Sequence, residues 1–255
     1  MKIAKILLAA AAVLAVGAGA AQAEIKKIRI GTEGAYPPFN SVDSSGKLVG
    51  FDIEIGEALC AKMKAECTFV AQDWDGIIPA LLAKKYDVIL ASMSITDERK
   101  EKVAFTIPYY LTPGSFIAPK DTKLTAITPE ALKGKTIGAQ SSTTGATYLE
   151  DKYKGSDIKL YPTQDEANAD LAAGRLDAVL ADKFVLYEWL EKSTDGKCCK
   201  FIGADLADVN PDGTGIAVRK DDNELREALN KAIKEIQADG TYAKINAKYF
   251  PFPIN

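Results

Sequence analysis

Five polar segments of this chain each follow an apolar run that has the character of a buried strand. They are residues 32–36, 72–74, 92–99 and 139–144 and Asp182, and all contain groups that form hydrogen bonds or carry charge. Arg99 closes the third segment, soon after the apolar run that ends at Leu90. On a short surface helix this arginine would be a solvated charge, whereas in a cleft it could bind an anion. The elements that carry these segments decide between the two interpretations.

The chain contains no histidine at all. This absence excludes Ser-His-Asp and Cys-His catalysis, and it removes the commonest zinc ligand. We therefore expect neither a metal nor a cofactor. The chemistry open to the polar segments is that of hydrogen bonds, charge and aromatic faces.

Strands and helices alternate along the chain, and the alternation occurs twice. The first run predicts strands at 26–32, 67–71 and 86–92 with helices at 51–64 and 74–85. The second predicts strands at 136–140, 157–161 and 175–182 with helices at 143–154, 163–174 and 183–192. This pattern is typical of α/β structure built as two lobes, each a mostly parallel sheet flanked by helices.

Two internal echoes support the duplication. Residues 81–92 (LLAKKYDVILAS) align with residues 171–182 (LAAGRLDAVLAD), and IRIGTE, which begins at Ile28, aligns with KTIGAQ, which begins at Lys135. The echoes occur in the same order in both halves, which favours two lobes of like architecture.

The lobe boundaries follow from the segments that remain. Residues 105–119 are rich in β-formers with Pro and Gly and suit a crossover, whereas 213–221 and 222–240 predict a further strand and a long helix. This last part has no counterpart in the second half, so we expect lobe 1 to contain 24–111 and 207–255, and lobe 2 to contain 112–206. Ligands of open α/β sheets bind beyond the carboxyl ends of the strands, so the polar segments should face one cleft between the lobes.

The N-terminal residues are typical of a signal for export. Lys2 and Lys5 precede an apolar run, and Ala21-Gln22-Ala23 forms a cleavage site, so residues 1–23 should be removed and the mature chain should begin at Glu24. Loss of the two lysines changes the formal charge from −3 to −5. An acidic chain is poorly suited to nucleic acid or an anionic membrane surface as its main partner.

The four cysteines fit an oxidising compartment. Cys60 and Cys67 lie where a predicted helix runs into a predicted strand, which favours a short-loop disulfide over two free thiols. Cys198 and Cys199 are adjacent, and neighbouring cysteines strain to pair with each other. The sequence leaves their state open.

Several of these motifs resemble those of the periplasmic amino-acid-binding proteins of ABC importers, in particular the lysine/arginine/ornithine- and histidine-binding group. The motifs are GFDIEIGEAL, LLAKKYDVILASMSITDERKEKVAFTIPYY and AGRLDAVLAD, and the similarity runs along essentially the whole mature chain. The resemblance implies a two-lobe, type II binding-protein fold that closes on an amino acid and delivers it to a membrane-embedded permease. It further implies a monomeric receptor in the periplasm, with no role for nucleic acid.

The resemblance also assigns the site. By position, Arg99 would bind the α-carboxylate with backbone N–H groups near Ser94 and Thr143, and Asp182 would bind the α-ammonium, with Ser92 and Ser94 nearby. Tyr36 and Trp74 would form aromatic walls, and a tryptophan between two aspartates at a helix start is poorly placed for a core. The full set of predicted ligand-binding residues is Glu33, Tyr36, Trp74, Ser92, Ser94, Arg99, Gln140, Ser142, Thr143 and Asp182.

Selectivity is predicted to reside in Glu33, Tyr36, Trp74 and Gln140. An anionic group beside aromatic walls favours a cationic ligand side chain, so we expect arginine, ornithine and lysine to bind. Glu33, Ala91, Ser141 and Trp74 depart from the lysine/arginine/ornithine pattern, which has Asp, Ser, Gly and Phe there, so histidine, glutamine and opines stay open. Two rival functions are an exported structural protein and an enzyme like cyclohexadienyl dehydratase, in which Glu33 or Asp182 would serve as acid or base.

Overall fold

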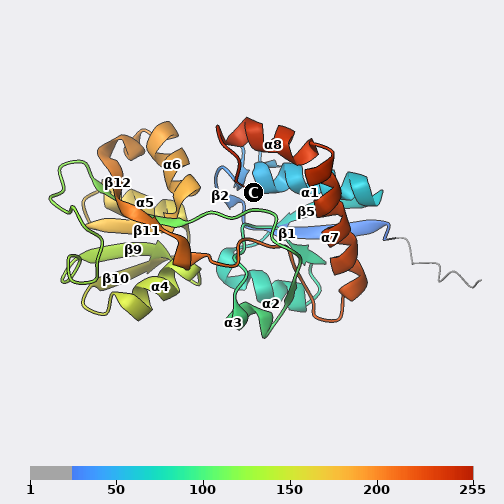
Figure 1. Cartoon of the computed structure of the whole chain (residues 1–255), viewed down its shortest axis with the longest axis horizontal. Coiled ribbons are helices and arrows are strands. Elements are labelled where there is room, and N and C mark those ends of the chain that lie inside the picture. Colours follow the sequence, from blue (N-terminus) through green and yellow to red (C-terminus); the bar gives the residue numbers. More distant parts are fainter. Residues whose placement is uncertain (1–24, 255) are drawn as a thin grey trace, which may run out of the picture.

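The computed structural model describes residues 25–254 and consists of two α/β lobes, each built on a five-stranded sheet (Figure 1). The strand order is β5-β1-β6-β13-β7 in the first lobe and β10-β9-β11-β8-β12 in the second. The strands of the first sheet are β1 (Lys27–Thr32), β5 (Glu66–Ala71), β6 (Val88–Ile89), β7 (Ala104–Phe105) and β13 (Ala217–Val218). Those of the second are β8 (Gly114–Pro119), β9 (Thr136–Gln140), β10 (Asp157–Tyr161), β11 (Ala178–Asp182) and β12 (Cys199–Leu206).

The predicted two-lobe α/β fold is confirmed, and the structure adds antiparallel strands to the parallel part of each sheet. In the first lobe β5, β1 and β6 run parallel, and in the second lobe β10, β9 and β11 do. Strands β13, β7, β8 and β12 add antiparallel pairs. These strands lie next to the crossovers, where the chain enters or leaves a lobe, so their direction is set by the crossovers and not by a βαβ unit.

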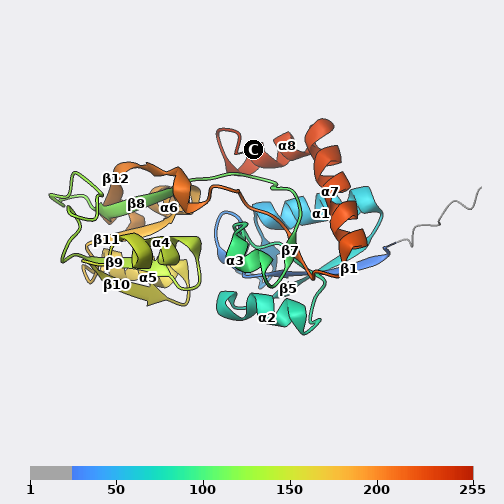
Figure 2. The same ribbon diagram turned by 60° about the horizontal axis from the view of Figure 1, so that its bottom comes forward.

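Helices cover both faces of the first sheet, as Figure 2 shows with α2 on one side and α1, α7 and α8 on the other. The helices of this lobe are α1 (Phe51–Met63), α2 (Ile77–Leu82), α3 (Asp97–Lys100), α7 (Asn223–Ala238) and α8 (Thr241–Tyr249). Those of the second lobe are α4 (Thr144–Lys152), α5 (Gln164–Ala172) and α6 (Lys183–Lys192). Three short 3₁₀ helices, η1 (Trp74–Gly76), η2 (Asp195–Cys198) and η3 (Ala207–Val209), and the small sheet of β2 (Ala35–Tyr36), β3 (Asn40–Val42) and β4 (Leu48–Val49) complete the fold.

The two sequence echoes occupy equivalent places in the two sheets. Gly31 pairs with Ile89 in the first sheet, and Gly138 pairs with Val179 in the second. A Cβ atom on either glycine would overlap a neighbouring side chain, Tyr86 in one lobe and Leu176 in the other. The glycines therefore leave room for a large side chain against β1 and β9.

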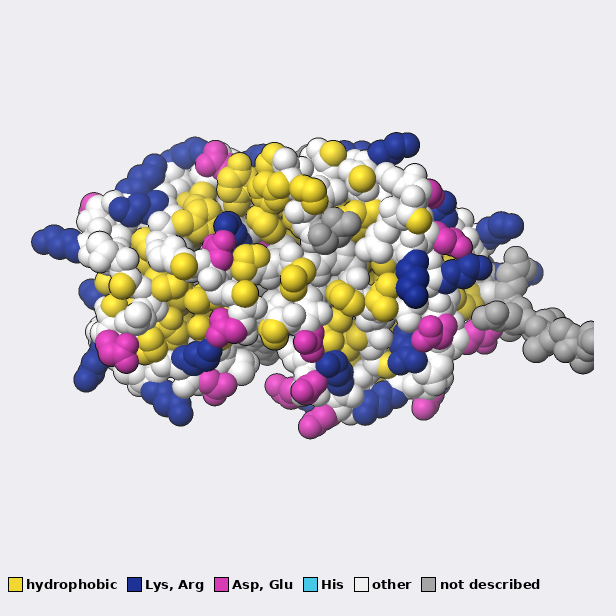
Figure 3. Space-filling model, viewed as in Figure 1, with side chains coloured by type: hydrophobic (Ala, Val, Ile, Leu, Met, Phe, Trp, Pro, Cys, Tyr) yellow, Lys and Arg dark blue, Asp and Glu magenta, His cyan; other side chains and the backbone are white. Residues whose placement is uncertain are grey.

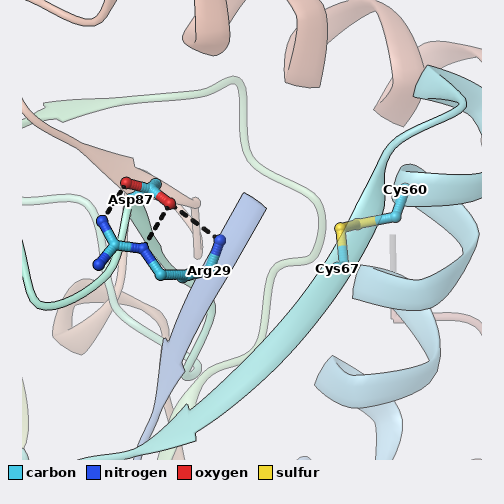
Figure 4. The surroundings of a disulfide bond; sticks show 4 residues. All are labelled: Arg29, Cys60, Cys67 and Asp87. Carbon is cyan, nitrogen blue, oxygen red and sulfur yellow. Dashed lines mark hydrogen bonds and ion pairs between the residues drawn. A yellow bond between two sulfur atoms is a disulfide. The ribbon is translucent and has the colours of Figure 1, made fainter. Parts of the chain in front are cut away.

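The aspartates in the echoes also make the same contact in both lobes. The carboxylate of Asp87 accepts a hydrogen bond from the backbone N–H of Arg29 at 2.9 Å, and Asp177 accepts one from the N–H of Thr136 at 2.9 Å. Figure 4 shows Asp87, which also forms an ion pair with the Arg29 guanidinium. The duplicated sequence thus encodes a duplicated strand pairing.

Two crossovers connect the lobes, one between β7 and β8 and one between β12 and β13. They touch each other at an isolated bridge between Tyr110 and Thr214. After the second crossover the chain adds β13 to the first sheet, and α7 and α8 then pack against α1 (Figure 1). The C-terminal part of the chain therefore belongs to the same lobe as the N-terminal part.

Both cysteine pairs are disulfides. Cys60 in α1 is joined to Cys67 in β5, with their Cα atoms 6.2 Å apart (Figure 4). Cys198 and Cys199, whose state the sequence left open, are joined to each other where η2 passes into β12. Within residues 25–254 no cysteine is free.

On the face drawn in Figure 3, basic and acidic side chains are interspersed around apolar ones, and neither charge forms a continuous patch. No helix within residues 25–254 combines the length and apolar character needed to cross a membrane. The predicted signal segment 1–23 and its cleavage site lie outside the described residues.

Candidate functional site

A pocket lies between the two lobes, beyond the carboxyl ends of β1, β6, β9 and β11. Its walls come from both lobes and both crossovers, and they are formed by Glu33, Tyr36, Trp74, Ala91, Ser92, Ser94, Arg99, Thr112, Pro113, Gly114, Gln140, Thr143, Thr144, Gly145, Gln164, Ala181, Asp182, Val209, Asn210 and Thr214. Nine of the ten predicted ligand-binding residues line this pocket. The tenth, Ser142, lies on an adjoining groove between the lobes.

Arg99 is held in place by the backbone of both lobes. It lies in α3, whose N-cap Thr96 accepts a hydrogen bond from the Arg99 N–H at 3.2 Å. Its guanidinium donates to the carbonyl of Ser94 at 2.8 Å and to that of Ser142 at 2.9 Å, and it lies 5.3 Å from the centre of the Trp74 ring. These contacts occupy two of its five N–H donors and leave the others for a ligand.

Arg99 has no anionic partner among residues 25–254, because none of their ion pairs includes it. Burial lowers the pKa of Arg99 to about 10, so the side chain stays charged at neutral pH. A desolvated guanidinium without a carboxylate is costly unless a ligand supplies one.

The N-terminus of α4 completes this anion site. Its N-cap Thr143 donates its hydroxyl to the carbonyl of Gln140 at 2.8 Å and accepts from the N–H of Ala146 at 3.1 Å. The next two residues, Thr144 and Gly145, face the pocket at the first turn, where backbone N–H groups have no partner inside the helix. A helix N-terminus beside a guanidinium is suited to a carboxylate.

Asp182 presents a carboxylate from the second lobe. It caps α6, accepting from the N–H of Phe184 at 2.7 Å and of Val185 at 3.4 Å, and its other oxygen accepts from the hydroxyl of Thr112. Burial raises its pKa to about 6, while these donors act in the opposite direction. No cation among the described residues pairs with it, so lone pairs remain for an ammonium group.

Glu33 lines the same pocket and is largely buried, with 9% of the residue exposed. Its carboxylate accepts a hydrogen bond from the amide of Gln140 at 2.6 Å, across the two lobes. Its pKa is raised to about 7, chiefly by burial, with further contributions from the negative charges of Asp165, Asp73 and Asp75. Glu33 therefore faces the pocket as an acidic group that a bound cation would stabilise in its ionised form.

The aromatic side chains of the pocket are only partly what the sequence predicts. Tyr36 lines the pocket, and its ring stacks on that of Phe39 with the two ring centres 6.2 Å apart. Trp74 also lines it, but the residue is 8% exposed and packs in a core cluster with Ile77 and Tyr86, so the prediction that it is poorly placed for a core is wrong. The indole ring is large enough to pack in the core with one part and line the pocket with another.

Three predicted serine sites contribute in ways that residue type alone does not reveal. Ser92 directs its hydroxyl to the buried Asp52 at 2.9 Å, and Ser94 holds Arg99 through its carbonyl. The hydroxyl of Ser142 donates to Asp75 at 2.7 Å, outside the pocket, while its carbonyl accepts from Arg99 and from the Trp74 indole. Ser142 therefore joins the lobes.

Four polar pocket residues lie outside the predicted polar segments. Thr112 and Asn210 come from the two crossovers, Thr214 follows Asn210 closely, and Gln164 begins α5. Gln164 lies just beyond the carboxyl end of β10, so the tendency of ligands to bind beyond strand ends is a signal that could have found it. The crossover residues carry a weaker signal, because they lie in connecting segments and not at the carboxyl end of a parallel strand.

Two α/β lobes joined by two crossovers, with a closed polar pocket between them, define a two-lobe solute-binding protein. Residues 28–252 match the model of the bacterial extracellular solute-binding proteins, family 3, and the chain belongs to this family. Its relatives are named for binding and not for catalysis, in agreement with the prediction of a receptor that is not an enzyme.

Individual relatives match over nearly their full length. The chain is 46% identical to the L-arginine-binding protein of Pseudomonas aeruginosa over 234 residues, covering 90% of each chain. It is 43% identical to the lysine/arginine/ornithine-binding periplasmic protein of Escherichia coli over 231 residues, covering 89% of this chain and 88% of that one. A solved structure of an ancestral arginine-binding protein bound to arginine matches with a TM-score of 0.83 at 38% identity, covering 89% and 99% of the two chains.

Proposed function

We propose that this protein is an extracytoplasmic receptor that captures a cationic L-amino acid and delivers it to an ABC importer. The observation that carries the proposal is the set of unpaired charges in the pocket. One cation, Arg99, and two anions, Glu33 and Asp182, face the same space, and none of the three has a counter-charge among the described residues. A ligand with one carboxylate and two cationic groups would complement this set, and arginine, ornithine and lysine have that composition.

The positions of the charges support one orientation of the ligand. Arg99 and the N-terminus of α4 would take the α-carboxylate, and Asp182 would take the α-ammonium. The cationic end of the side chain would then lie toward Glu33 and Tyr36. We expect arginine to be favoured weakly, because a planar guanidinium can donate to Glu33 in a two-point contact and stack on an aromatic ring.

Relatives support the same ligand class, since proteins 46% and 43% identical to this chain are named for arginine and for lysine, arginine and ornithine. We propose that residues 1–23 are removed after Ala23, and that the receptor works in the periplasm as a monomer with a membrane-embedded ABC permease as its partner.

Capture would take place by closure of two lobes, composed of 24–111 with 207–255 and of 112–206. Several hydrogen bonds support this proposal because they run between the lobes in the closed arrangement: Gln140 to Glu33, the Trp74 indole to the carbonyl of Ser142, and Ser141 to Asp75. Opening about the two crossovers would break all of them and expose the pocket.

Calorimetry with a panel of amino acids tests the proposal. Arginine, ornithine and lysine should bind, and citrulline should bind more weakly than arginine by about 2–5 kcal/mol, because it would leave Glu33 desolvated without a counter-charge. Tighter binding of glutamine, histidine or octopine than of arginine would overturn the cationic assignment. Consumption of prephenate or arogenate would overturn the receptor assignment itself.

A further inference from the structure

Asp52 is a buried carboxylate directly behind the pocket wall. It is the second residue of α1, it is 0% exposed, and it is absent from the pocket lining. None of the ion pairs among the described residues includes it. An uncompensated carboxylate in a core is expensive, so its place in the fold calls for an explanation.

Donors from three separate segments converge on this carboxylate. The amide of Asn40 donates at 2.9 Å, the hydroxyl of Tyr109 at 2.7 Å, and the hydroxyl of Ser92 at 2.9 Å. The backbone of Ser92 also contributes to lowering the pKa of this carboxyl. Burial raises the pKa of Asp52 to about 6 against the effect of these donors, so the group is ionised at neutral pH and acts only as an acceptor.

Ser92 is the member of this network that lines the pocket. Its φ angle is 54°, in the left-handed region that non-glycine residues rarely adopt, and its hydroxyl donates to Asp52 from that conformation. The single hydroxyl hydrogen of Ser92 is therefore committed to Asp52. The Ser92 oxygen has two lone pairs. The hydroxyl of Tyr110 lies beside Ser92 and Thr214 and can occupy one of these lone pairs, so at least one remains for the pocket.

We propose that Asp52 is a positioning residue for recognition of the ligand's α-ammonium group. Because Asp52 accepts the hydrogen bond of the Ser92 hydroxyl, the Ser92 oxygen can act toward the pocket only as an acceptor. It can then accept a hydrogen bond from the ligand's ammonium group together with Asp182. The inference rests on the proposed function in one respect, namely that the ligand is an α-amino acid. It does not depend on the charge of the ligand side chain.

The test compares L-arginine with 5-guanidinopentanoate, which keeps the carboxylate and the guanidinium but lacks the α-ammonium. In Asp52→Asn the uncharged amide either turns an N–H toward Ser92 or offers it a weaker acceptor. Arginine should then bind about tenfold more weakly, whereas the affinity for 5-guanidinopentanoate should change less than about threefold. Equal losses for both compounds would mean a merely structural role and would overturn the inference, as would no loss for either.

A double-mutant cycle with Ser92→Ala tests whether Asp52 acts through Ser92. The Ser92→Ala variant should lose affinity for arginine selectively, and adding Asp52→Asn should weaken binding no further. Additive losses would overturn the inference. Tyr109→Phe is the matched control: it removes the donor to the other oxygen of Asp52 and leaves the hydroxyl of Ser92 and its hydrogen bond to Asp52 in place, so it should lower the melting temperature and leave the ratio of the two affinities unchanged.

Two safeguards keep the outcome readable. If Asp52→Asn does not fold, Ser92→Ala decides, because an unchanged ratio of arginine to 5-guanidinopentanoate affinity in that variant contradicts the inference. If the wild type binds L-glutamine and not arginine, the cationic proposal fails. The inference about Asp52 is then decided by comparing L-glutamine with 5-amino-5-oxopentanoate, which lacks the α-ammonium, and the same outcomes support or overturn it.

Discussion

The two groups of residues proposed to bind the two parts of the ligand are built differently. At the proposed head-group end, Arg99 lies in a capped helical turn, Asp182 is itself the N-cap of α6, and the first turn of α4 contributes backbone groups. At the side-chain end, Glu33 lies in the turn between β1 and β2 and is fixed by a side-chain hydrogen bond to Gln140. Under the proposed function, recognition of the part shared by all amino acids would thus be built into secondary structure, whereas recognition of the variable part would depend on a few side chains that can change without changing the fold.

The largest effect should come from breaking the head-group end. Arg99→Ala removes the guanidinium that would pair with the α-carboxylate, so the affinity for every amino acid ligand should fall by about 3–5 kcal/mol. Arg99→Lys should recover only part of the loss, because an ammonium cannot reproduce a planar two-point contact. Calorimetry with arginine and lysine measures both losses.

The matched control is Arg175→Ala, which removes an exposed arginine paired with Asp170 on the surface. Its affinity should equal that of the wild type. Normal binding by Arg99→Ala would show that the carboxylate is held elsewhere.

The second change removes the charge at the side-chain end. Glu33→Gln should bring the affinities for arginine and citrulline close together, removing most of the gap of about 2–5 kcal/mol expected in the wild type. It should lower the affinity for arginine and raise that for citrulline, because the variant has no desolvated charge for citrulline to leave unpaired. Glu66→Gln, at an exposed glutamate in β5, serves as the control. If the difference between the arginine and citrulline affinities is as large in Glu33→Gln as in the wild type, another residue determines the selectivity.

The third prediction uses pH to separate the ends. The pKa of Glu33 is raised to about 7 and that of Asp182 to about 6 in the unliganded protein, and a bound cation would lower both. The complex then holds fewer protons than the free receptor, so affinity rises with pH until each carboxylate is ionised. Arginine affinity should fall by up to about tenfold per pH unit below about pH 7, and more steeply below about pH 6.

Variants assign the two parts of this profile. Besides its hydrogen bond from Gln140, Glu33 is influenced by the negative charges of Asp165, Asp73 and Asp75, all of which stay in place in Glu33→Gln. That variant should lose the upper part of the profile and keep the lower part. An identical profile in both proteins, measured by calorimetry from about pH 5 to about pH 8, would contradict the assignment of the upper part to Glu33.

The fold could be predicted through residues whose environment is set by the local chain. The echoed glycines and aspartates, Gly31 with Gly138 and Asp87 with Asp177, are readable because each serves the strand next to it. The direction of the crossover strands could not be predicted in this way, because it depends on how two lobes are joined.

The same distinction applies to the site. The resemblance assigned the nine predicted residues that line the pocket, and all nine lie in segments that follow a predicted strand, which is a local property of the chain. The direction of a side chain is not local. Ser92 turns to Asp52 and Ser142 to Asp75, both distant in sequence, and Asp52 itself has the pattern of a polar position on an amphipathic helix although it is fully buried.

The smallest effect should come from a contact that belongs to neither end. Asp75 in η1 accepts the hydroxyls of Ser142 at 2.7 Å and Ser141 at 3.0 Å from the opposite lobe, outside the pocket. Asp75→Ala should therefore act chiefly on closure and weaken it by about 0.5–1.5 kcal/mol, the net contribution of a typical hydrogen bond, because these contacts are exposed and solvent screens the carboxylate. Because closure is needed for any ligand, the affinities for arginine and citrulline should fall by the same factor.

Asp73→Ala is the matched control for the Asp75 prediction, because Asp73 adds a similar negative charge near Glu33 but makes no hydrogen bond to the second lobe among the described residues. It should leave the citrulline affinity unchanged. Calorimetry gives both affinities, and scattering should show a smaller compacted fraction for Asp75→Ala at limiting ligand. If Asp75→Ala lowers only the arginine affinity, Asp75 acts through its charge on the side-chain end, and the contact between the lobes contributes nothing to capture.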